Sequence, residues 1–289
     1  MPRKELTIFT PTYNRAYILP KLYDSLKKQT CKDFIWLIVD DGSEDNTKKL
    51  VDSWIEEKKI EIKYYYQDNS GKSQAYNLAI LKCDTLLISC VDSDDYLDDD
   101  AVEEIINDYK QSNNAIGLVY MRRRADGTMI SKWSSKLEYA TLREAYSRYG
   151  IFGDTMLVYD TKIIKKHSFP KFKGEKFVPE SYLYDQLDRY GVLKFIHKAI
   201  YICEYLPDGY THSMAKVIKS NPEGYLAYIN QRLDMDRLLI DICSDTIRYC
   251  AVSISANKKK IITSARRPLI TAILFPLGIA FYRLRYKNI

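Results

Sequence analysis

The chain has 289 residues, which predicts one large domain or one domain with an extension. Hydrophobic residues make up 46% of it and charged residues 28%, an ordinary globular composition that excludes intrinsic disorder. The formal net charge of +6 suits a polyphosphate ligand or an anionic membrane surface, and we expect no nucleic-acid partner. The six cysteines are scattered without a CxxC pair, and we expect no signal peptide before the first strand. We therefore expect a reduced, cytoplasmic protein without structural zinc.

Short apolar runs alternate with amphipathic segments through roughly the first 95 residues. The runs are typical of buried strands, and the segments between them are typical of helices. This β-α-β-α-β-α-β order predicts an α/β fold with a mostly parallel sheet and right-handed crossovers. The expected strands cover residues 6–10, 35–39, 60–66 and 86–91, and the expected helices between them end near residues 28, 57 and 81.

Three of these strands end in polar clusters, at Pro11–Arg15, Asp40–Ser43 and Asp92–Asp95. Ligands of open α/β sheets bind outside the carboxyl ends of the strands, so the clusters predict a binding site. Three crowded carboxylates repel one another, and a divalent cation is the simplest compensation. Mg²⁺ or Mn²⁺ held by Asp92-x-Asp94 and a diphosphate fits this chemistry, whereas an acidic loop or a helix N-cap is the alternative.

The chain continues with less regular elements. Residues 115–120 predict a strand, followed by Arg122–Arg124 and a hairpin turn at Asp126-Gly127. We interpret the three arginines as an exposed basic edge strand, and attraction of an anionic acceptor is the alternative. Later segments predict strands over 152–159 and 199–205, a short helix over 162–166 and helices within 221–257.

The tail has a different composition from the rest. An apolar segment of about 15 residues, 268–282, is interrupted by Pro276 and Gly278 and is short for a membrane span. Basic residues lie on both sides of it, at Arg266 and Arg267 and again after the segment. We therefore expect an interfacial anchor on the cytoplasmic face of a membrane, with a buried terminal helix as the alternative.

Four motifs occur in order over residues 5–100: Pro11-Thr12-Tyr13-Asn14-Arg15, Val39-Asp40-Asp41-Gly42-Ser43, Asn69-x-Gly71-x-Ser73-x-Ala75-x-Asn77 and Asp92-x-Asp94-Asp95. Together they resemble the motifs of family 2 glycosyltransferases with the GT-A fold. The resemblance implies a Rossmann-like sheet between helices, with donor binding in 1–115, acceptor binding in 116–215 and a helical extension in 216–289.

The resemblance also implies an activity. A sugar would pass, with inversion, from a nucleoside-diphosphate donor to a hydroxyl of a glycan or lipid-linked acceptor. A UDP-sugar is the expected donor, Mn²⁺ or Mg²⁺ the expected cofactor, and bacterial cell-surface polysaccharide synthesis the expected setting.

The resemblance assigns the donor site residue by residue. Tyr13 would stack on the nucleotide base, and Pro11 and Thr12 would line the pocket. Asp41, together with Asp40, would accept hydrogen bonds from the base or the ribose. Asp92 would contact the ribose side, and Asn69, Lys72 and Ser93 are the remaining candidate donor-binding residues.

The diphosphate and the metal would be held next to the donor. Asp94 would bind the metal with Asp92 beside it, and His212 is a further candidate ligand, with an exposed loop histidine as the alternative. Lys72 is suited to face a phosphate, and a solvated loop lysine is the alternative. Many relatives have arginine where Tyr76 stands, so that phosphate contact would be absent here.

Glu180 is the candidate catalytic base, because relatives carry an acidic pair just before a helix at this point. Pro179 departs from the usual glutamate, and a plain acidic residue at a helix start is the alternative for Glu180. Glu175 and Asp185 are the fallback candidates.

Two other classes of function stay open at this point. One is a relative that binds a nucleotide-sugar without turnover. The other is a nucleotidyltransferase, which would be expected to carry a glycine-rich loop after its first strand. Pro11–Arg15 contains no glycine, which argues against the second class.

Overall fold

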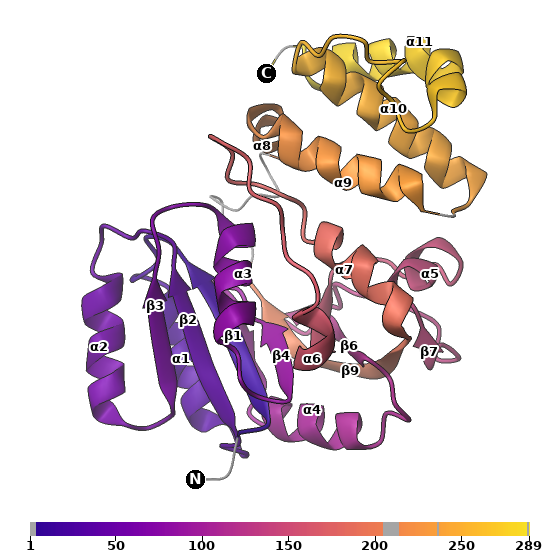
Figure 1. Ribbon diagram of the computed structural model, residues 1–289. Coiled ribbons are helices and arrows are strands. Elements are labelled where there is room, and N and C mark those ends of the chain that lie inside the picture. Colours follow the sequence, from indigo (N-terminus) through magenta and orange to yellow (C-terminus); the bar gives the residue numbers. More distant parts are fainter. Residues whose placement is uncertain (1–3, 205–213, 236, 288) are drawn as a thin grey trace. The chain divides into compact units, whose positions relative to one another are not determined.

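The computed structural model describes residues 4–204, 214–235, 237–287 and 289, and the chain divides into two compact units (Figure 1). The first unit comprises Met1–Ser168 and Gln186–Leu206, and the second comprises Phe169–Asp185 and Pro207–Ile289. The first contains the sheet and the second is helical, so the predicted α/β fold with a C-terminal helical part is confirmed. The assignment of donor binding to residues 1–115 and acceptor binding to residues 116–215 stays a prediction.

One sheet runs through the first unit and contains nine strands within the described residues. The strands are β1 Leu6–Thr12, β2 Phe34–Asp40, β3 Ile62–Tyr66, β4 Leu87–Cys90, β5 Tyr96–Leu97, β6 Gly117–Arg124, β7 Tyr139–Ala140, β8 Thr155–Asp160 and β9 Leu193–Cys203. Their order is β3-β2-β1-β4-β8-β6-β9-β5, with β7 paired to β9. The first four strands pair in parallel, whereas β8 lies antiparallel to both β4 and β6.

Helices cover both faces of the parallel part of this sheet. The helices of the first unit are α1 Leu19–Lys28, α2 Thr47–Glu57, α3 Lys72–Lys82, α4 Ala101–Lys110, α5 Leu142–Ser147, α6 Thr161–Ile164 and the 3₁₀ helix η1 Asp188–Tyr190. Tyr23 of α1 stacks on Trp36 of β2, with ring centroids 5.9 Å apart, and Tyr76 of α3 meets Phe9 of β1 edge-on at 5.0 Å. Trp36 pairs with Ile8, the residue before Phe9. Successive side chains of a strand point to opposite faces of the sheet, so Trp36 and Phe9 lie on opposite faces. The helices that pack on them, α1 and α3, therefore cover opposite sides of the sheet (Figure 1).

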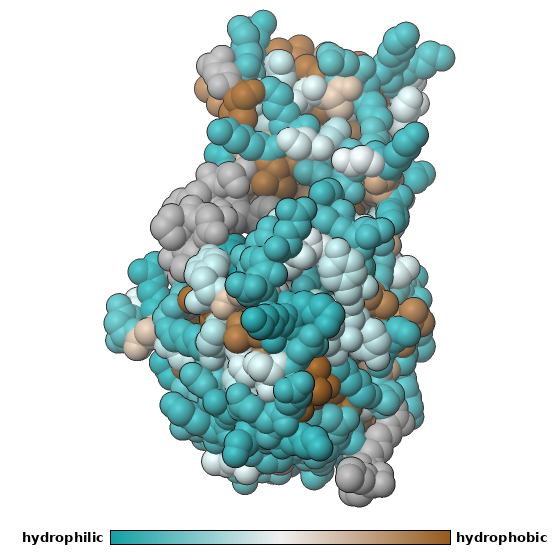
Figure 2. All heavy atoms as spheres, turned by 90° about the vertical axis from the view of Figure 1, so that its left-hand side faces the viewer, coloured by the Kyte–Doolittle hydropathy of each residue, from teal (hydrophilic) through white to brown (hydrophobic). Residues whose placement is uncertain are grey.

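This double cover explains the sequence pattern of the strands. All seven residues of β2 are buried, because a parallel strand between two helix layers has no solvent face. The α2 side of the unit is mostly hydrophilic (Figure 2), since α2 buries only Thr47, Val51 and Trp54. The four predicted strands and the helices between them are confirmed, with ends that differ by one or two residues.

The basic run after residue 120 lies in an unexpected place. β6 continues through Arg124 and is hydrogen-bonded to β8 on one side and β9 on the other. The pairing with β8 ends at Met121, and the arginines lie between Tyr201–Cys203 of β9 and the backbone of Thr128 and Ile130, so the prediction of an exposed edge strand is wrong. The predicted turn at Asp126-Gly127 is confirmed: the Gly127 N–H donates to the Arg124 carbonyl at 3.0 Å, with a φ of +86°.

The second unit is a helical assembly with its own core. Its helices are α8 Met214–Ser220, α9 Pro222–Asp234, α10 Leu239–Ser255 and α11 Pro268–Arg285, and α7 Ser181–Leu187 crosses the sequence boundary between the units. Both carboxylate oxygens of Glu175 accept backbone N–H groups at the start of α9, those of Glu223 and Gly224, at 2.9 and 2.8 Å. The buried core is formed by Ile218, Leu226, Ile229, Leu233, Ile242, Tyr249, Cys250, Ala251, Val252, Ala265 and Tyr286.

The tail is one continuous helix, so the expected interruption at Pro276 and Gly278 is wrong. α11 runs through Pro276 and rests on α10. A Cβ on Gly278 would lie 2.3 Å from the Cβ of Cys250, so only glycine permits this approach of the two helices. Packing against α10 therefore stabilises a helix that its proline would weaken in isolation.

Candidate functional site

The polar strand ends of the first unit meet at one edge of the sheet. Thr12 at the end of β1 pairs with Asp40 at the end of β2, and the Asp41 N–H donates to the Thr12 carbonyl at 2.8 Å. On the other side of β1, the Val91 N–H donates to the Phe9 carbonyl at 2.9 Å and leads β4 into the aspartates. The predicted convergence of these clusters is confirmed.

Asp41 holds the loop that leads into α3. Its carboxylate accepts hydrogen bonds from Gln67 Nε2 at 2.7 Å and from the backbone N–H groups of Ser70 and Gly71, each at 2.8 Å. The side chain is buried, so these bonds replace water that the carboxylate has lost. The sequence suggested Asp41 as a nucleotide contact, but no sequence signal indicated this role in fixing the loop.

Asp40 and the loop after it are fixed in a similar way. The Asp40 carboxylate accepts from the Tyr64 hydroxyl at 2.6 Å and from the Ser43 N–H at 2.8 Å. Ser43 Oγ in turn accepts from the N–H of Asn14, whose φ of +53° turns the chain after β1. Tyr13 lies between these anchored residues and is 46% exposed, so its ring is accessible to a ligand.

Asn69 lies on the loop between β3 and α3, and this loop packs tightly against the loop after β2. A Cβ on Gly42 would lie 2.9 Å from the Asn69 backbone nitrogen, and Gly42 has a φ of +88°. Glycine is therefore required at position 42 both by its backbone conformation and by this close approach. Pro11 and Thr12 at the end of β1, Tyr13 in the loop after it, Asp41 after β2 and Asn69 before α3 thus lie near the same edge of the sheet.

The aspartates after β4 have different partners. Asp92 accepts an ion-paired hydrogen bond from Lys72 Nζ at 2.6 Å. Asp95 accepts from the Tyr201 hydroxyl at 2.7 Å and from the Glu204 N–H at 2.9 Å, and the same hydroxyl accepts from the Asp92 N–H at 3.1 Å. Asp95 therefore ties the aspartate loop to the end of β9, a contact that sequence reasoning missed.

The charge state of the cluster follows from these contacts. Burial opposes ionisation of Asp92, but the charges of Lys72 and Arg122 outweigh it and lower the pKa of that carboxyl. Burial and the neighbouring Asp92 raise the pKa of Asp94 above its usual value. The same two causes raise the pKa of Asp95 to about 7, against the hydrogen bond from Tyr201.

The donor set fits a cation that is shared with a ligand. Asp92 and Asp94 supply two carboxylates, and Mg²⁺ or Mn²⁺ is commonly held by one or two carboxylates together with substrate phosphates. Burial and, after it, the charge of Asp92 raise the pKa of Asp94, and a cation would stabilise its ionised form. Within the described residues, no group of three or more His, Cys, Asp or Glu side chains forms a complete metal cage. The candidate ligand His212 lies outside the described residues.

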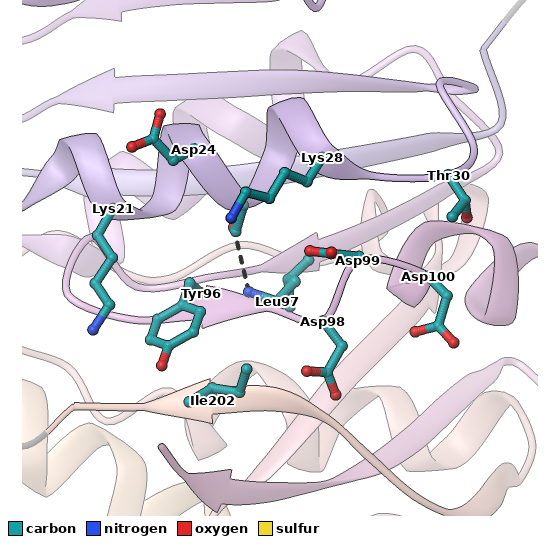
Figure 3. Close-up of a pocket in the computed structure, with 11 residues that line it drawn as sticks. Lys21, Asp24, Lys28, Thr30, Tyr96, Leu97, Asp98, Asp99, Asp100 and Ile202 are labelled. Carbon is teal, nitrogen blue, oxygen red and sulfur yellow. Dashed lines mark hydrogen bonds between the residues drawn. The ribbon is translucent and has the colours of Figure 1, made fainter. Parts of the chain in front are cut away.

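A surface groove of about 680 Å³ lies elsewhere on the first unit, between α1 and β5 (Figure 3). Lys21 Nζ lies 4.4 Å from the centre of the Tyr96 ring there, and Asp98 follows β5 along the groove. None of the predicted donor-site residues lines it. The groove is therefore distinct from the edge that carries the aspartates.

The three candidate bases belong to the second unit and differ in their partners. Glu175 caps α9 with both oxygens, as described above. Asp185 is buried, and its carboxylate lies 3.6 Å from Arg232 Nη1 in an ion pair. Glu180 directly precedes α7, as the sequence predicted, and accepts from the Tyr184 hydroxyl at 3.0 Å.

Comparison with known proteins gives a consistent result. Residues 7–168 match the family described as Glycosyl transferase family 2. A teichoic acid poly(glycerol phosphate) polymerase of Staphylococcus epidermidis is 26% identical over 165 residues, which are 56% of this chain and 23% of that protein. The chain thus spans about a quarter of that relative.

Two solved structures share the fold over nearly the whole chain. TarS 1-349 from S. aureus, in complex with UDP-GlcNAc, has a TM-score of 0.63 at 16% identity and covers 98% of this chain and 91% of its own. Mannosyltransferase PcManGT from Pyrobaculum calidifontis, in complex with GDP-Man and Mn²⁺, has a TM-score of 0.58 at 15% identity and covers 99% and 82%. At these identities the similarity establishes the fold, and the predicted GT-A architecture is confirmed.

Proposed function

Because the chain belongs to glycosyl transferase family 2, we propose that it transfers a sugar, with inversion, from a nucleoside-diphosphate donor to an acceptor hydroxyl. The resemblance inferred from the four sequence motifs is thereby confirmed, and with it the class of enzyme. The observation that carries the proposal is the meeting of the three anchored loops with the aspartates after β4 at one edge of the sheet.

The three loops suit a nucleotide. Tyr13, half-exposed between anchored neighbours, offers a ring for base stacking, and Pro11 and Thr12 line the same position. The Asp40 and Asp41 carboxylates retain acceptor capacity beyond their internal hydrogen bonds, since each has about four lone-pair sites. A UDP-sugar is the proposed donor, supported by the shared fold with a structure that holds UDP-GlcNAc.

The aspartate loop suits the diphosphate. We assign Asp94, with Asp92 beside it, as the residues that would hold Mn²⁺ or Mg²⁺. When bound, the cation would offset the charge that grows on the leaving diphosphate. Ser93 between them and Lys72 at the start of α3 complete the residues that face this part of the donor. Asp95, tied to Tyr201 and Glu204, orients the loop.

The acceptor hydroxyl must lose a proton, and Glu180 is the proposed base. The other two acidic candidates have structural roles in the second unit: Glu175 caps a helix and Asp185 is paired with Arg232. Glu180 lies directly before α7, where the family motif places the base, and accepts a hydrogen bond from the Tyr184 hydroxyl. The acceptor is proposed to be a glycan or a lipid-linked glycan, and the process cell-surface polysaccharide synthesis. The name of the S. epidermidis relative supports that setting.

The tail is proposed to contact a membrane. Within the described residues, α11 is the one helix that is long and apolar enough to cross a bilayer by length and composition. Only Thr271 and Gly278 of α11 are buried, where the helix packs on α10. Leu269, Ile273, Leu277 and Leu284 are 54–87% exposed and recur at spacings that place them on one face.

This arrangement favours a helix that lies in the membrane surface over one that spans it. A span would separate Gly278 from Cys250 and remove Tyr286 from the core of the second unit. An interfacial helix keeps these contacts and buries its apolar face in lipid, while Arg266 and Arg283 at its ends meet anionic headgroups. The protein would then act at the cytoplasmic face of the membrane.

A hydrolysis screen tests the proposed activity. The protein is incubated with UDP-GlcNAc, other UDP-sugars and GDP-mannose, with Mn²⁺ or with EDTA, and released nucleoside diphosphate is measured. We expect slow, metal-dependent release from at least one donor. Failure of every donor to bind or react in the presence of metal would overturn the proposal.

A further inference from the structure

The aspartate loop of the first unit is accompanied by two cations from distant parts of the chain. Asp92, Asp94 and Asp95 lie within four consecutive residues. Lys72, at the first position of α3, and Arg122, within β6, both act electrostatically on Asp92. Together with Arg15, which acts on Asp94, these positive charges partly balance the three carboxylates.

The two cations are held very differently. The Arg122 guanidinium carbon lies 4.0 Å from the centre of the Tyr201 ring, and Arg122 belongs to a strand that is paired on both sides. Tyr201 is itself tied to Asp95 and to the Asp92 backbone. Arg122 is thus a fixed part of the framework that orients the loop.

Lys72 reaches the aspartate loop through the tip of its side chain. Its Nζ forms a 2.6 Å ion pair with Asp92 Oδ1, and both side chains are 29% exposed. A lysine has a flexible four-carbon stem and a point charge without the planar fork of arginine. The Lys72 ammonium can therefore change partners by rotating its own side chain, with no movement of the strand framework.

We propose that the ion pair between Lys72 and Asp92 competes with the binding of a cation to the aspartate loop, and that Lys72 exchanges Asp92 for the donor diphosphate when metal and nucleotide bind. This inference rests on the proposed function and adds a competition between a resident lysine and the cation.

The competition follows from the chemistry of the two partners. A divalent cation on Asp92 and Asp94 repels the ammonium group that lies 2.6 Å from Asp92 Oδ1 and shares that carboxylate with it. A bound diphosphate offers Lys72 a new anionic partner near the same loop, because α3 begins immediately after the loop that Asp41 fixes. Nucleotide would then favour metal binding by removing its competitor, and the linkage is reciprocal.

Replacing Lys72 tests its effect on metal binding and on nucleotide binding separately. In Lys72→Met, Mn²⁺ binding without nucleotide is expected to tighten by about tenfold, because the competing charge is gone. UDP binding at saturating Mn²⁺ is expected to weaken by about tenfold, because the diphosphate loses a cation. Free Mn²⁺ is measured by its EPR signal, and UDP binding by calorimetry.

Two further variants control for changes in the fold. Lys63→Met removes a comparable lysine of the same unit, paired with Asp84 at 3.3 Å, and should alter neither affinity. Lys72→Arg keeps the charge and should leave Mn²⁺ binding without nucleotide close to that of the wild type.

The outcomes distinguish this inference from the function on which it rests. Tighter Mn²⁺ binding with weaker UDP binding in Lys72→Met supports the exchange. Unchanged or weaker Mn²⁺ binding in a folded Lys72→Met, while the wild type binds UDP with Mn²⁺, overturns the exchange and leaves the proposed function intact. If the wild type binds neither UDP nor GDP at any Mn²⁺ concentration, the proposed function fails, and the exchange fails with it.

Discussion

Replacing Asp41 by asparagine should destabilise the protein even when no nucleotide is present. The carboxylate accepts three hydrogen bonds, from Gln67 and from the backbone N–H groups of Ser70 and Gly71. Asparagine has nearly the same shape, but one of its two terminal groups is an NH₂ donor. Whichever way the amide is turned, a donor faces at least one N–H group.

The magnitude follows from the type of bond. A hydrogen bond to a charged group contributes about 1.5–3 kcal/mol, and an unsatisfied buried donor costs about 1–3 kcal/mol. The free energy of unfolding should therefore fall by roughly 2–4 kcal/mol, which corresponds to a Tm lower by about 5–10 °C. Thermal unfolding of the ligand-free protein measures this, with Asp68→Asn, an exposed residue of the same loop, as the control. An unchanged Tm together with lost nucleotide binding would refute the scaffolding role and make Asp41 a ligand contact alone.

Three other changes test separate parts of the account. Glu180→Gln should lower kcat by about 10²–10⁴-fold with little change in donor Kd; a normal kcat with a lowered Tm would make Glu180 a helix-start residue only. The double variant Ile273→Glu, Leu277→Glu alters exposed positions of α11 and should abolish sedimentation with anionic vesicles while leaving donor hydrolysis unchanged. Retained vesicle binding would disprove the interfacial helix. Burial lowers the pKa of His167, so the folded state resists its protonation, and stability should fall as the pH drops below about 6.5. The fall of Tm with decreasing pH should be smaller in His167→Gln than in the wild type. An identical fall in both proteins would show that other groups cause it.

Local features of the sequence predicted the first half of the fold well. The apolar runs of β1, β2 and β4 are continuous because helices cover both faces of the sheet, and that cover is encoded in each run itself. The polar clusters that end these strands predicted a common edge, since parallel strands bring like ends together. Asp92 and Asp94 lie at that common edge, and their roles stay predictions.

Long-range pairing explains what the sequence did not predict. Tyr201 meets Asp95 across 106 positions of the chain, and no local pattern marks either residue as a partner. Arg122 was taken for an edge residue because a basic run is usually solvated, whereas β9 pairs with it on one side and the Ile130 N–H donates to its carbonyl on the other. The continuity of α11 through Pro276 likewise depends on tertiary packing, at Gly278 against Cys250.

The most direct test of the account concerns Asp94 and metal-dependent binding of the nucleotide. Calorimetry of UDP with the wild type should give a markedly lower Kd in Mn²⁺ than in EDTA. Asp94→Ala should remove most of that difference, because the cation loses its main protein ligand. The exposed Asp99→Ala should keep the difference and controls for net charge. A folded Asp94→Ala protein that still binds UDP more tightly with Mn²⁺, by the same factor as the wild type, would contradict the assignment of the aspartate loop as the diphosphate and metal site.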